Sequence, residues 1–563
     1  MQEGHTIFPI KDEDVRKDLL DEHPKSKAKV NLYTWLVSFT SGLGGFLFGY
    51  EIGIINQVFT MLPFKLFFGL ITYDADSNTY HSSPDRADIE GWITFTFLIG
   101  AALGALIVSY PMNLFGRKRT IIGGGSIFLV SVIIQSLSTG RGLLYLGRLG
   151  AGIGVGIESA TVPVYISETA ETSIRGRLIG TYQLMITCGI FFATCVNSVI
   201  ILAMGDDSGD LEWRMSFALQ LIPCLLMMVS MSFMPLSPRW LIYRGRTSEA
   251  LQVLIRLRGK DSGDDEVIRE HQDMLDTVEQ QKRYGETSWS QLFTDPYVRY
   301  RTFLGVSLQF FQQWTGINVI LYFGAALFDA LGFSPMLSTI GFPLINSLFT
   351  VLATLPGMYL IERWGRKKLL VWGGACMSVS LLLVTLFGHI GESQDKLDTL
   401  GIGAILFVFT FTLSFGSTWG PVVWVYQAEI FPFRYRAKAT SISTVSNWVW
   451  NSIVSKSAPL LLSAFGFKSY LLWAGFCAVM AVFAHFCVPE TKGLSLEEIN
   501  EFQILVTLNP AIPMERSVDA SPTAASTPHD NPEMNQRTLI EYTENVCISS
   551  LSLHLASSET PSL

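Results

Sequence analysis

Charged residues are scarce in this sequence. Asp, Glu, Lys and Arg make up only 16% of its 563 residues, whereas hydrophobic residues make up 49%. Soluble domains carry nearer a quarter of charged residues, and the mean hydropathy of this chain is positive, +0.35. The composition therefore excludes an ordinary soluble protein and indicates a membrane protein.

Features of secreted, disulfide-bonded proteins are also missing. The first 30 residues lack the apolar core and small-residue cleavage site of a secretory signal, so we expect the first apolar run to direct membrane insertion. Because a thiol in an apolar run behaves as a small hydrophobic group, the cysteines indicate no disulfide framework. Five of the seven lie well within such runs: Cys188, Cys195, Cys224, Cys376 and Cys477.

Enzyme signatures are lacking too. The sequence contains no Walker loop, metal-ligand cluster or nucleophile motif. Its glycine-rich stretches, such as "GGGSIF" and "GIGVGIE", lie in apolar runs, where glycine serves helix packing. We therefore expect no catalysis, no cofactor, no bound metal and no nucleic-acid partner.

What the sequence does contain is a series of long apolar runs. Each is close to the length of roughly 20 residues that crosses about 30 Å of hydrocarbon. Six precede a long polar connection, near 33–60, 89–110, 120–138, 143–165, 177–203 and 214–234. Six follow it, near 302–330, 337–361, 368–389, 400–427, 438–463 and 468–488. The sequence thus predicts an all-α membrane protein whose 12 transmembrane helices form two six-helix bundles.

The short loops alternate in charge, which predicts orientation. Lys and Arg are retained on the cytoplasmic side of a membrane, while acids count for little. One set of loops holds clusters of cations, such as Arg117, Lys118 and Arg119. The alternate loops hold mostly acids, such as Asp206 and Asp207. We expect both termini to lie in the cytosol and the lipid bilayer to be the main partner.

Composition divides the rest of the chain. The longest connection contains 245–257 and 264–284, which have helical spacing and dense charge and predict short cytoplasmic helices. The end of the chain is rich in Ser, Thr, Pro and Asn, which predicts disorder. The expected segments are an N-terminal tail, a first bundle, a cytoplasmic helical linker, a second bundle, a cytoplasmic C-terminal segment and a disordered tail: 1–32, 33–234, 235–300, 301–488, 489–505 and 506–563.

The two bundles resemble each other. "NLFGRKRT" (113–120) recurs as "IERWGRKKL" (361–369), each directly after the second run of its half. After the fourth run, Glu168 with Arg175 recurs as Glu429 with Arg436. A duplicated six-helix unit explains both repeats, and such parallel repeats are a known transporter plan in which two bundles rock about a central site.

Several motifs carry a resemblance to a known family. They are "GRLGAGIGVG", "PVYISETAETSIRGRL", "PLSPRWL", "FQQWTGINVILYF", "GPVVWVYQAEIFPFRYRAKA" and "PETKGLSLEEI", in that order. With them, roughly 33–500 resembles the sugar porters of the major facilitator superfamily, most of all fungal hexose transporters. The resemblance implies the major facilitator fold and transport of a monosaccharide across the plasma membrane by alternating access.

Amides in the run 302–330 point to a polar ligand. Gln312, Gln313 and Asn318 lie close in helical phase, and amides in hydrocarbon are costly unless they face a wet cavity. An amide offers both donors and acceptors, which suits a neutral polyhydroxylated ligand. The alternative is that these amides only join helices.

The resemblance implies the full binding set. The implied sugar contacts are Gln183, Gln312, Gln313, Asn318, Asn346, Trp424, Asn447 and Trp448. The implied lids are Phe48, Tyr322 and Phe323. Glucose or another hexose is the expected substrate, although a pentose, polyol, disaccharide or quinate-like acid stays open.

A lone acid, Glu51, lies near the middle of the first run in "GGFLFGYEIGIINQVFTML". A charge at that depth is costly, so Glu51 should face the bundle interior and bind a proton or pair with a cation, most obviously Arg148. The resemblance implies that this pair couples sugar to proton transport. Facilitated diffusion and a purely structural ion pair are the alternatives.

Charged residues at the inner ends of the runs predict a gate. Ion pairs that form together in one state bias a two-state equilibrium, and the expected gate residues are Arg117, Glu168, Arg175, Glu362, Arg366, Glu429 and Arg436. Retention of cations inside the cell is the alternative reading. Lys456, within the eleventh run, either extends to the interface or has a role in substrate binding or coupling.

A sugar receptor is the rival from another class. Some fungal members of the resembled family sense sugar and signal through a long cytoplasmic tail, and this chain has a tail of about 60 residues. The tail has no obvious repeated motif, and the expected site residues remain in place, so transport is the favoured interpretation.

Overall fold

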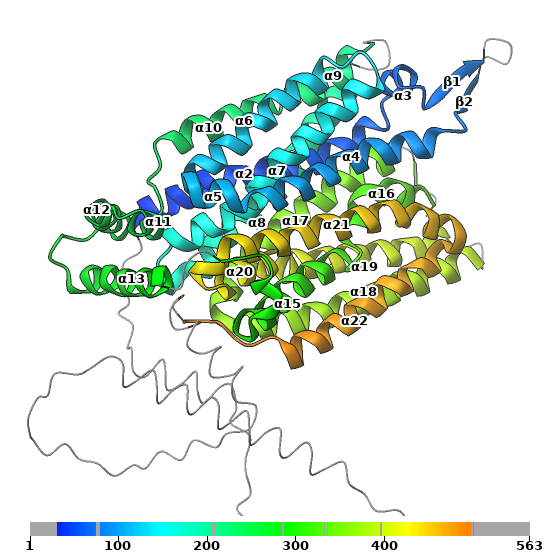
Figure 1. Cartoon of the computed structure of the whole chain (residues 1–563). Helices are drawn as coiled ribbons and strands as arrows, with labels where there is room; N and C mark the ends of the chain where they lie inside the picture. Colours follow the sequence, from blue (N-terminus) through cyan, green and yellow to red (C-terminus); the bar gives the residue numbers. More distant parts are fainter. Residues whose placement is uncertain are drawn as a thin grey trace, which may run out of the picture. The chain divides into compact units, whose positions relative to one another are not determined.

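The computed structural model describes residues 31–74, 79–204, 209–283, 287–330, 333, 334, 336–393, 397–494, 496 and 499. The predicted disordered tail 506–563 lies outside the described residues, as does nearly all of the predicted tail 1–32. The described part is almost entirely helical (Figure 1).

The first half contains the six predicted runs as helices. They are α2 (Leu32–Val58), α4 (Arg86–Ile107), α6 (Arg117–Ser136), α7 (Arg141–Thr169), α8 (Arg175–Met204) and the successive α9 (Leu211–Ala218) and α10 (Leu221–Ser232). Three short elements connect them: α3 (Leu62–Phe67), α5 (Ser109–Phe115) and η1 (Thr172–Ile174). The Asn31 side chain caps α2 by accepting a 3.1 Å hydrogen bond from the Tyr33 backbone N–H, which satisfies a donor that the helix leaves free.

Short elements lie at the two ends of the helical bundle. The strands β1 (Ile71–Asp74) and β2 (Thr79–Ser82) form an antiparallel hairpin, which the sequence did not predict. The linker forms α11 (Pro238–Tyr243), α12 (Thr247–Arg258), α13 (Asp265–Arg283) and α14 (Gln291–Thr294). Figure 1 shows α11–α13 at one end and the hairpin at the other. These are called the linker end and the hairpin end below.

The linker helices α11 and α12 are packed onto the first half. Their own core includes Trp240 and Leu254. Arg258 at the end of α12 donates to the Thr169 carbonyl oxygen at the end of α7, at 3.1 Å. The Thr34 hydroxyl of α2 donates to the Leu257 carbonyl oxygen at 2.6 Å. The predicted segments 245–257 and 264–284 correspond closely to α12 and α13.

The second half repeats the plan. Its helices are α15 (Pro296–Gln313), α16 (Ile317–Ala330), α17 (Phe342–Trp364), α18 (Arg366–Ser393), α19 (Leu397–Ser417), α20 (Trp419–Ile430), α21 (Phe433–Phe465) and α22 (Tyr470–Cys487). A π-helical turn, η3 (Leu337–Gly341), precedes α17, and the 3₁₀ turn η4 (Gly466–Ser469) precedes α22.

Two predicted runs of the second half are broken. The run 302–330 divides into α15 and α16, where Gly316 has a φ of +92° that favours glycine. The run 400–427 divides at Thr418, between α19 and α20. Pro421 contributes to that second break, because it has no N–H to bond the carbonyl four residues back.

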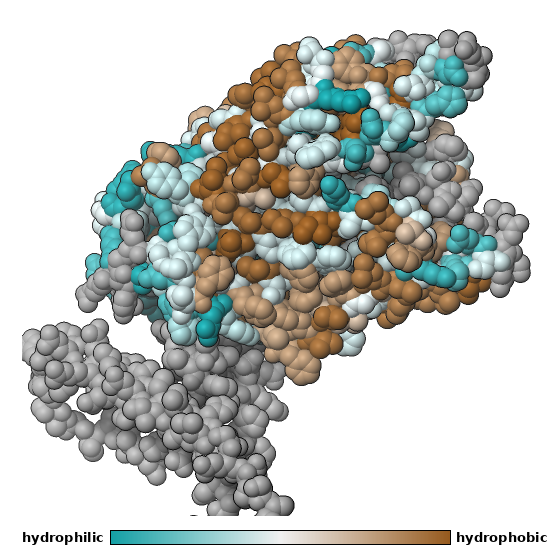
Figure 2. All heavy atoms as spheres, turned by 45° about the vertical axis from the view of Figure 1, so that its right-hand side comes forward, coloured by the Kyte–Doolittle hydropathy of each residue, from teal (hydrophilic) through white to brown (hydrophobic). Residues whose placement is uncertain are grey.

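The helix surface suits a membrane. Nine helical stretches of the described chain are long and apolar enough to span one, and the last of them, Phe433–Cys487, contains both α21 and α22. The described helix α2 and the α15–α16 pair, which carry several of the predicted site residues, are not among the nine. Figure 2 shows a broad hydrophobic surface between hydrophilic ends, as expected of a multi-pass membrane protein.

Glycines allow close helix contact within the first half. A Cβ atom added at Gly49 of α2 would lie 1.9 Å from the Ile186 carbonyl oxygen of α8, and one at Gly100 of α4 would lie 2.1 Å from the Leu149 carbonyl oxygen of α7. Any larger side chain would push these backbones apart. Small residues at such contacts are typical of helices packed in lipid.

Candidate functional site

A cavity of about 50 Å³ lies between the two halves. Helices α2 and α8 of the first half and α15, α16, α17, α19, α20 and α21 of the second half contribute to it. Its polar lining is made of hydroxyl and amide groups: Gln183, Thr187, Gln312, Gln313, Asn318, Thr350, Asn447 and Asn451. Since one water needs about 10–15 Å³ on this measure, the cavity has room for a few waters, and a larger ligand requires the halves to move apart.

The amides in the cavity bond to one another. The Asn447 amide donates to the Gln312 side-chain oxygen at 2.9 Å, and the Asn318 amide donates to the Gln313 side-chain oxygen. Gln312 in turn donates to the Trp419 carbonyl oxygen at 3.0 Å, at the start of α20. These amides are buried and bonded to one another, and the Asn447 side-chain oxygen has no hydrogen-bond partner among the described residues. The cluster can therefore exchange partners with the hydroxyl groups of a polyhydroxylated ligand.

The break between α15 and α16 positions this cluster. Gln312 and Gln313 end α15, and Asn318 lies in the first turn of α16. The Thr315 hydroxyl donates to the Gln312 carbonyl oxygen at 2.8 Å and accepts from the Ile317 N–H at 3.3 Å. Backbone groups freed by the break are thereby satisfied, as interrupted helices in membranes require.

Two predicted sugar contacts lie elsewhere. Trp448 does not line the cavity: its ring packs on Phe48 with centroids 4.8 Å apart, and its indole N–H donates to the Ser159 hydroxyl of the first half at 3.1 Å. The Asn346 side chain accepts from the Thr412 hydroxyl at 2.8 Å and lines a neighbouring cavity instead. The other six predicted contacts line the main cavity together with the predicted lid Phe48.

The remaining predicted lids lie on α16. Tyr322 is hydrogen-bonded to Asn451, one of the cavity-lining amides. The side chain of Phe323 lies outside the described residues.

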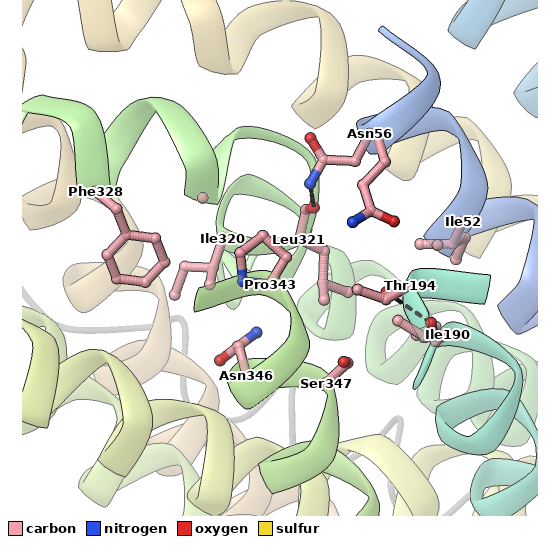
Figure 3. Close-up of a pocket in the computed structure, with 13 residues that line it drawn as sticks. Ile52, Asn56, Ile190, Thr194, Ile320, Leu321, Phe328, Pro343, Asn346 and Ser347 are labelled. Carbon is pink, nitrogen blue, oxygen red and sulfur yellow. Dashed lines mark hydrogen bonds between the residues drawn. The ribbon is translucent and has the colours of Figure 1, made fainter. Parts of the chain in front are cut away.

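The neighbouring cavity, of about 30 Å³, lies between α2, α8, α16 and α17 (Figure 3). Asn56 of α2 donates to the Leu321 carbonyl oxygen of α16 at 3.0 Å, which joins the two halves next to the predicted lids. The sequence analysis missed this contact. The sequence signal that could have identified it is the amide of Asn56 within an apolar run.

Glu51 and Arg148 form an ion pair in the interior of the first half. Both are buried, at 0% and 1% exposure. The Arg148 guanidinium also donates to the Ile93 carbonyl oxygen at 3.2 Å and lies over the Phe97 ring, 4.6 Å from its centroid. Gln135, which the sequence analysis missed, donates a long 3.4 Å hydrogen bond to Glu51. Because a buried charge without its partner is very costly, a proton on Glu51 and its contact with Arg148 compete.

The predicted gate residues form two equivalent clusters at the linker end. In the first half, Arg117 lies 2.8 Å from Glu168. In the second half, Arg366 lies 2.7 Å from Glu429 and 3.5 Å from Glu362. These pairs lie within one half each.

Further contacts of the predicted gate residues connect the halves at this end. Arg436 of α21 lies 3.3 Å from Glu168 of α7. Glu362 of α17 accepts from the Arg177 backbone N–H of α8 at 3.2 Å. Arg175 donates to the Leu494 carbonyl oxygen at 3.3 Å and lies within electrostatic range of Glu429. The linker end is therefore closed.

A second amide chain leads from the cavity toward the linker end. Asn447 donates to the Gln309 side-chain oxygen at 2.6 Å, and Gln309 donates to Gln427 of α20. Gln427 donates to the Thr444 hydroxyl at 2.9 Å. The sequence analysis missed Gln427, because a single glutamine near the end of a run shows no periodicity.

Lys456 lies at the surface. Its ammonium group is 5.9 Å from the centroid of the Trp92 ring and 5.7 Å from that of Phe95, both on α4 of the other half. This favours the interpretation of a cation that extends to the interface over one that binds substrate, since the described cavity linings do not include Lys456.

Known proteins resemble this chain over most of its length. Residues 37–502 match the family described as "Sugar (and other) transporter". The high glucose sensor RGT2 of Saccharomyces cerevisiae is 33% identical over 484 residues, which are 84% of this chain but only 61% of the sensor. The high-affinity hexose transporter HXT6 of the same yeast is 32% identical over 486 residues, 85% of this chain and 83% of the transporter.

Solved structures share the fold. The proton:xylose symporter XylE bound to 6-bromo-6-deoxy-D-glucose gives a TM-score of 0.72 at 28% identity, covering 84% of this chain and 99% of XylE. The inward-open conformation of XylE from E. coli gives a TM-score of 0.60.

Two similar helical halves that enclose a polar cavity define the class of protein: a multi-pass membrane transporter with the major facilitator fold, and not an enzyme. Within that class, the chain belongs to the sugar (and other) transporter family.

Proposed function

We propose that this protein carries a monosaccharide, glucose or another hexose, across the plasma membrane by alternating access. One observation carries the proposal: amides from both halves, Gln183 of the first and Gln312, Gln313, Asn318 and Asn447 of the second, line one cavity. Neutral donors and acceptors suit hydroxyl groups, and Trp424 in the same lining offers an apolar face to a sugar ring. The similarity to the yeast hexose transporter supports the substrate class.

In this proposal the chain crosses the membrane twelve times, with the linker end and both termini in the cytosol. The clustered cations at the linker end support this orientation, because Lys and Arg are retained on the cytoplasmic side. The described conformation is then closed toward the cytosol by Arg436–Glu168 and the groups around it. The TM-score with inward-open XylE, 0.60, is lower than the 0.72 with XylE bound to the glucose derivative, which agrees with that assignment.

Sugar movement is coupled to a proton through Glu51 and Arg148. A carboxylate paired with an arginine favours protonation when the arginine moves away and loses the proton when it returns, which links protonation to rocking. The similarity to a proton:xylose symporter supports coupling. The alternative, facilitated diffusion, keeps the same pair as a structural element.

Uptake of labelled glucose by cells without transporters of their own tests the proposal. The parent and Glu51→Gln are compared at several external pH values, with and without a protonophore. We expect the parent to accumulate sugar in a pH-dependent, protonophore-sensitive way and the variant to lose both properties. Normal, pH-independent uptake by both proteins would refute coupling and leave the sugar carrier intact.

A sensor is the second candidate, favoured by the 33% identity to a high glucose sensor. The sugar-facing amides are assembled in one cavity between the two halves, where alternating access would place a substrate, so transport is the preferred function. A sensor would give no uptake while still binding sugar.

A further inference from the structure

Glu158, on α7, is a second buried acid in the first half. Its side chain is 0% exposed, and neither carboxyl oxygen has a hydrogen-bond partner among the described residues. It is separate from the Glu51–Arg148 pair and does not line either described cavity. Neither the sugar pocket nor the coupling mechanism uses this group.

Three glycines make the space that the side chain occupies. A Cβ atom added at Gly44 of α2 would lie 3.2 Å from one Glu158 carboxyl oxygen, and one added at Gly125 of α6 would lie 3.5 Å from the other. At Gly124 of α6, an added Cβ would lie 3.3 Å from the Glu158 Cγ atom. The carboxyl group is thus packed between helix backbones, away from water.

The described titratable groups around Glu158 supply no positive charge. Tyr182 of α8 and Cys224 of α10 lie within electrostatic range, and α2 and α6 present glycines. The Cys224 thiol is already bonded to the Gly125 carbonyl oxygen at 3.3 Å. Arg148, on the same helix as Glu158, is paired with Glu51. An ionised carboxylate here would be an uncompensated buried charge, which is far costlier than a neutral acid.

We propose that Glu158 is a proton-binding site and is present as a neutral carboxylic acid. Helices α2, α6, α7, α8 and α10 all belong to the first half, so rocking of the halves as rigid bodies leaves the surroundings of Glu158 unchanged. The bound proton is therefore resident and is not carried with the sugar. This last step rests on the proposed function, whereas the protonation itself does not.

Infrared spectroscopy of the purified full-length protein tests protonation directly. A protonated carboxylic acid has a C=O stretch that is separate from the carboxylate bands and shifts in heavy water. We expect the parent to show a band of this kind that Glu158→Gln removes and Glu51→Gln leaves unchanged. Persistence of every such band in Glu158→Gln, or loss of the band in Glu51→Gln instead, would overturn the assignment.

Uptake measurements test residency. Glutamine has the shape and neutrality of the protonated acid, so Glu158→Gln should fold and transport sugar with the rate and pH dependence of the parent. A variant that fails to fold shows that the group is not a neutral acid. A folded variant with lost uptake or an altered pH profile shows that the proton moves during transport. If the parent itself gives no uptake, the proposed function fails while the infrared result still decides the protonation of Glu158.

Discussion

The guanidinium of Arg436, in the second half, lies 3.3 Å from the carboxylate of Glu168, in the first half. Glu168 also accepts hydrogen bonds from Arg117 at 2.8 Å and from the Ser237 hydroxyl at 2.6 Å, both within or next to its own half. When the halves part at the linker end, Glu168 therefore keeps two partners and loses one. Such a contact stabilises the closed linker end and can still break when the halves move apart.

Removal of this contact should open the linker end. We expect Arg436→Gln to destabilise the closed state by about 1–3 kcal/mol, because a buried charge-assisted contact is lost while Glu168 stays paired. Labelling of a reporter cysteine placed at the linker end should become faster, and sugar binding from the outer side should weaken. The control is Arg119→Gln, which removes an exposed cation at the same end of α6. Equal labelling in both variants would contradict a gate role for Arg436.

Substitution of a cavity amide should weaken sugar binding. Gln312→Leu removes the acceptor of the Asn447 amide and the donor to the Trp419 carbonyl oxygen. Since each hydrogen bond left unmade in a buried site costs about 1–3 kcal/mol, we expect the KM for sugar to rise roughly 10- to 100-fold. Uptake kinetics give the measurement, and Gln252→Leu, on the exposed side of α12, is the control. An unchanged KM would mean that the amides only join helices.

The Glu51–Arg148 pair predicts a clear double-mutant cycle. Arg148→Gln leaves Glu51 buried without its cation and should cost about 3–5 kcal/mol of stability if Glu51 stays ionised. Glu51→Gln combined with Arg148→Gln should recover most of that loss, because the remaining groups are neutral amides. Thermal unfolding in detergent measures each state. A double variant no more stable than Arg148→Gln would argue against direct pairing.

Much of this architecture could be predicted because its causes are local. Long apolar runs define helices, and the repeated "GRK" motifs and Glu–Arg spacing placed Arg117, Glu168, Arg366 and Glu429 at one end, where the structure also has them. The breaks at Gly316 and Thr418 could not be predicted from hydropathy, because each lies inside one continuous hydrophobic run. Sequence spacing does not show whether an ion pair lies within one half or between the halves, because this depends on how the helices pack.

Dependence on packing also explains which site residues were misplaced or missed. Trp448 points its indole N–H at Ser159 instead of the cavity, which depends on how two distant helices meet. Glu158 was overlooked because "GIGVGIE" was read as packing glycine alone. The glycines that make room for its side chain lie on α2 and α6, far away in the sequence.

The Asn56 contact predicts a latch at the hairpin end. Its amide donates to the Leu321 carbonyl oxygen of the other half. Asn56→Leu should therefore destabilise the state that is closed at the hairpin end by about 1 kcal/mol and speed release of sugar to the outer side about fivefold. Gln57→Leu is the matched control, because the Gln57 amide bonds to Ser198 within its own half. Exchange of labelled sugar across vesicles measures the rate. If both variants behave alike, the contact is not a latch.

The last prediction concerns Gln427, which links the cavity to the gate. Gln312 donates to the backbone at the start of α20, and Gln309 donates to the Gln427 side chain near its end. The gate residue Glu429 lies two residues after Gln427. Sugar that displaces Asn447 from its two glutamine partners would disturb both attachments together. Gln427 does not line the cavity, so it acts through other residues.

We therefore expect Gln427→Leu to keep the sugar affinity measured from the outer side while lowering the maximal transport rate. Thr444→Ser retains the hydroxyl that accepts from Gln427 and should transport normally, whereas Thr444→Val should resemble Gln427→Leu, because both remove the same 2.9 Å hydrogen bond. Equilibrium binding and uptake rates on the same preparations separate the two effects. A parallel loss of affinity and rate in Gln427→Leu would show that Gln427 only supports the shape of the cavity, since a residue that transmits the movement of α20 to Glu429 affects the rate alone.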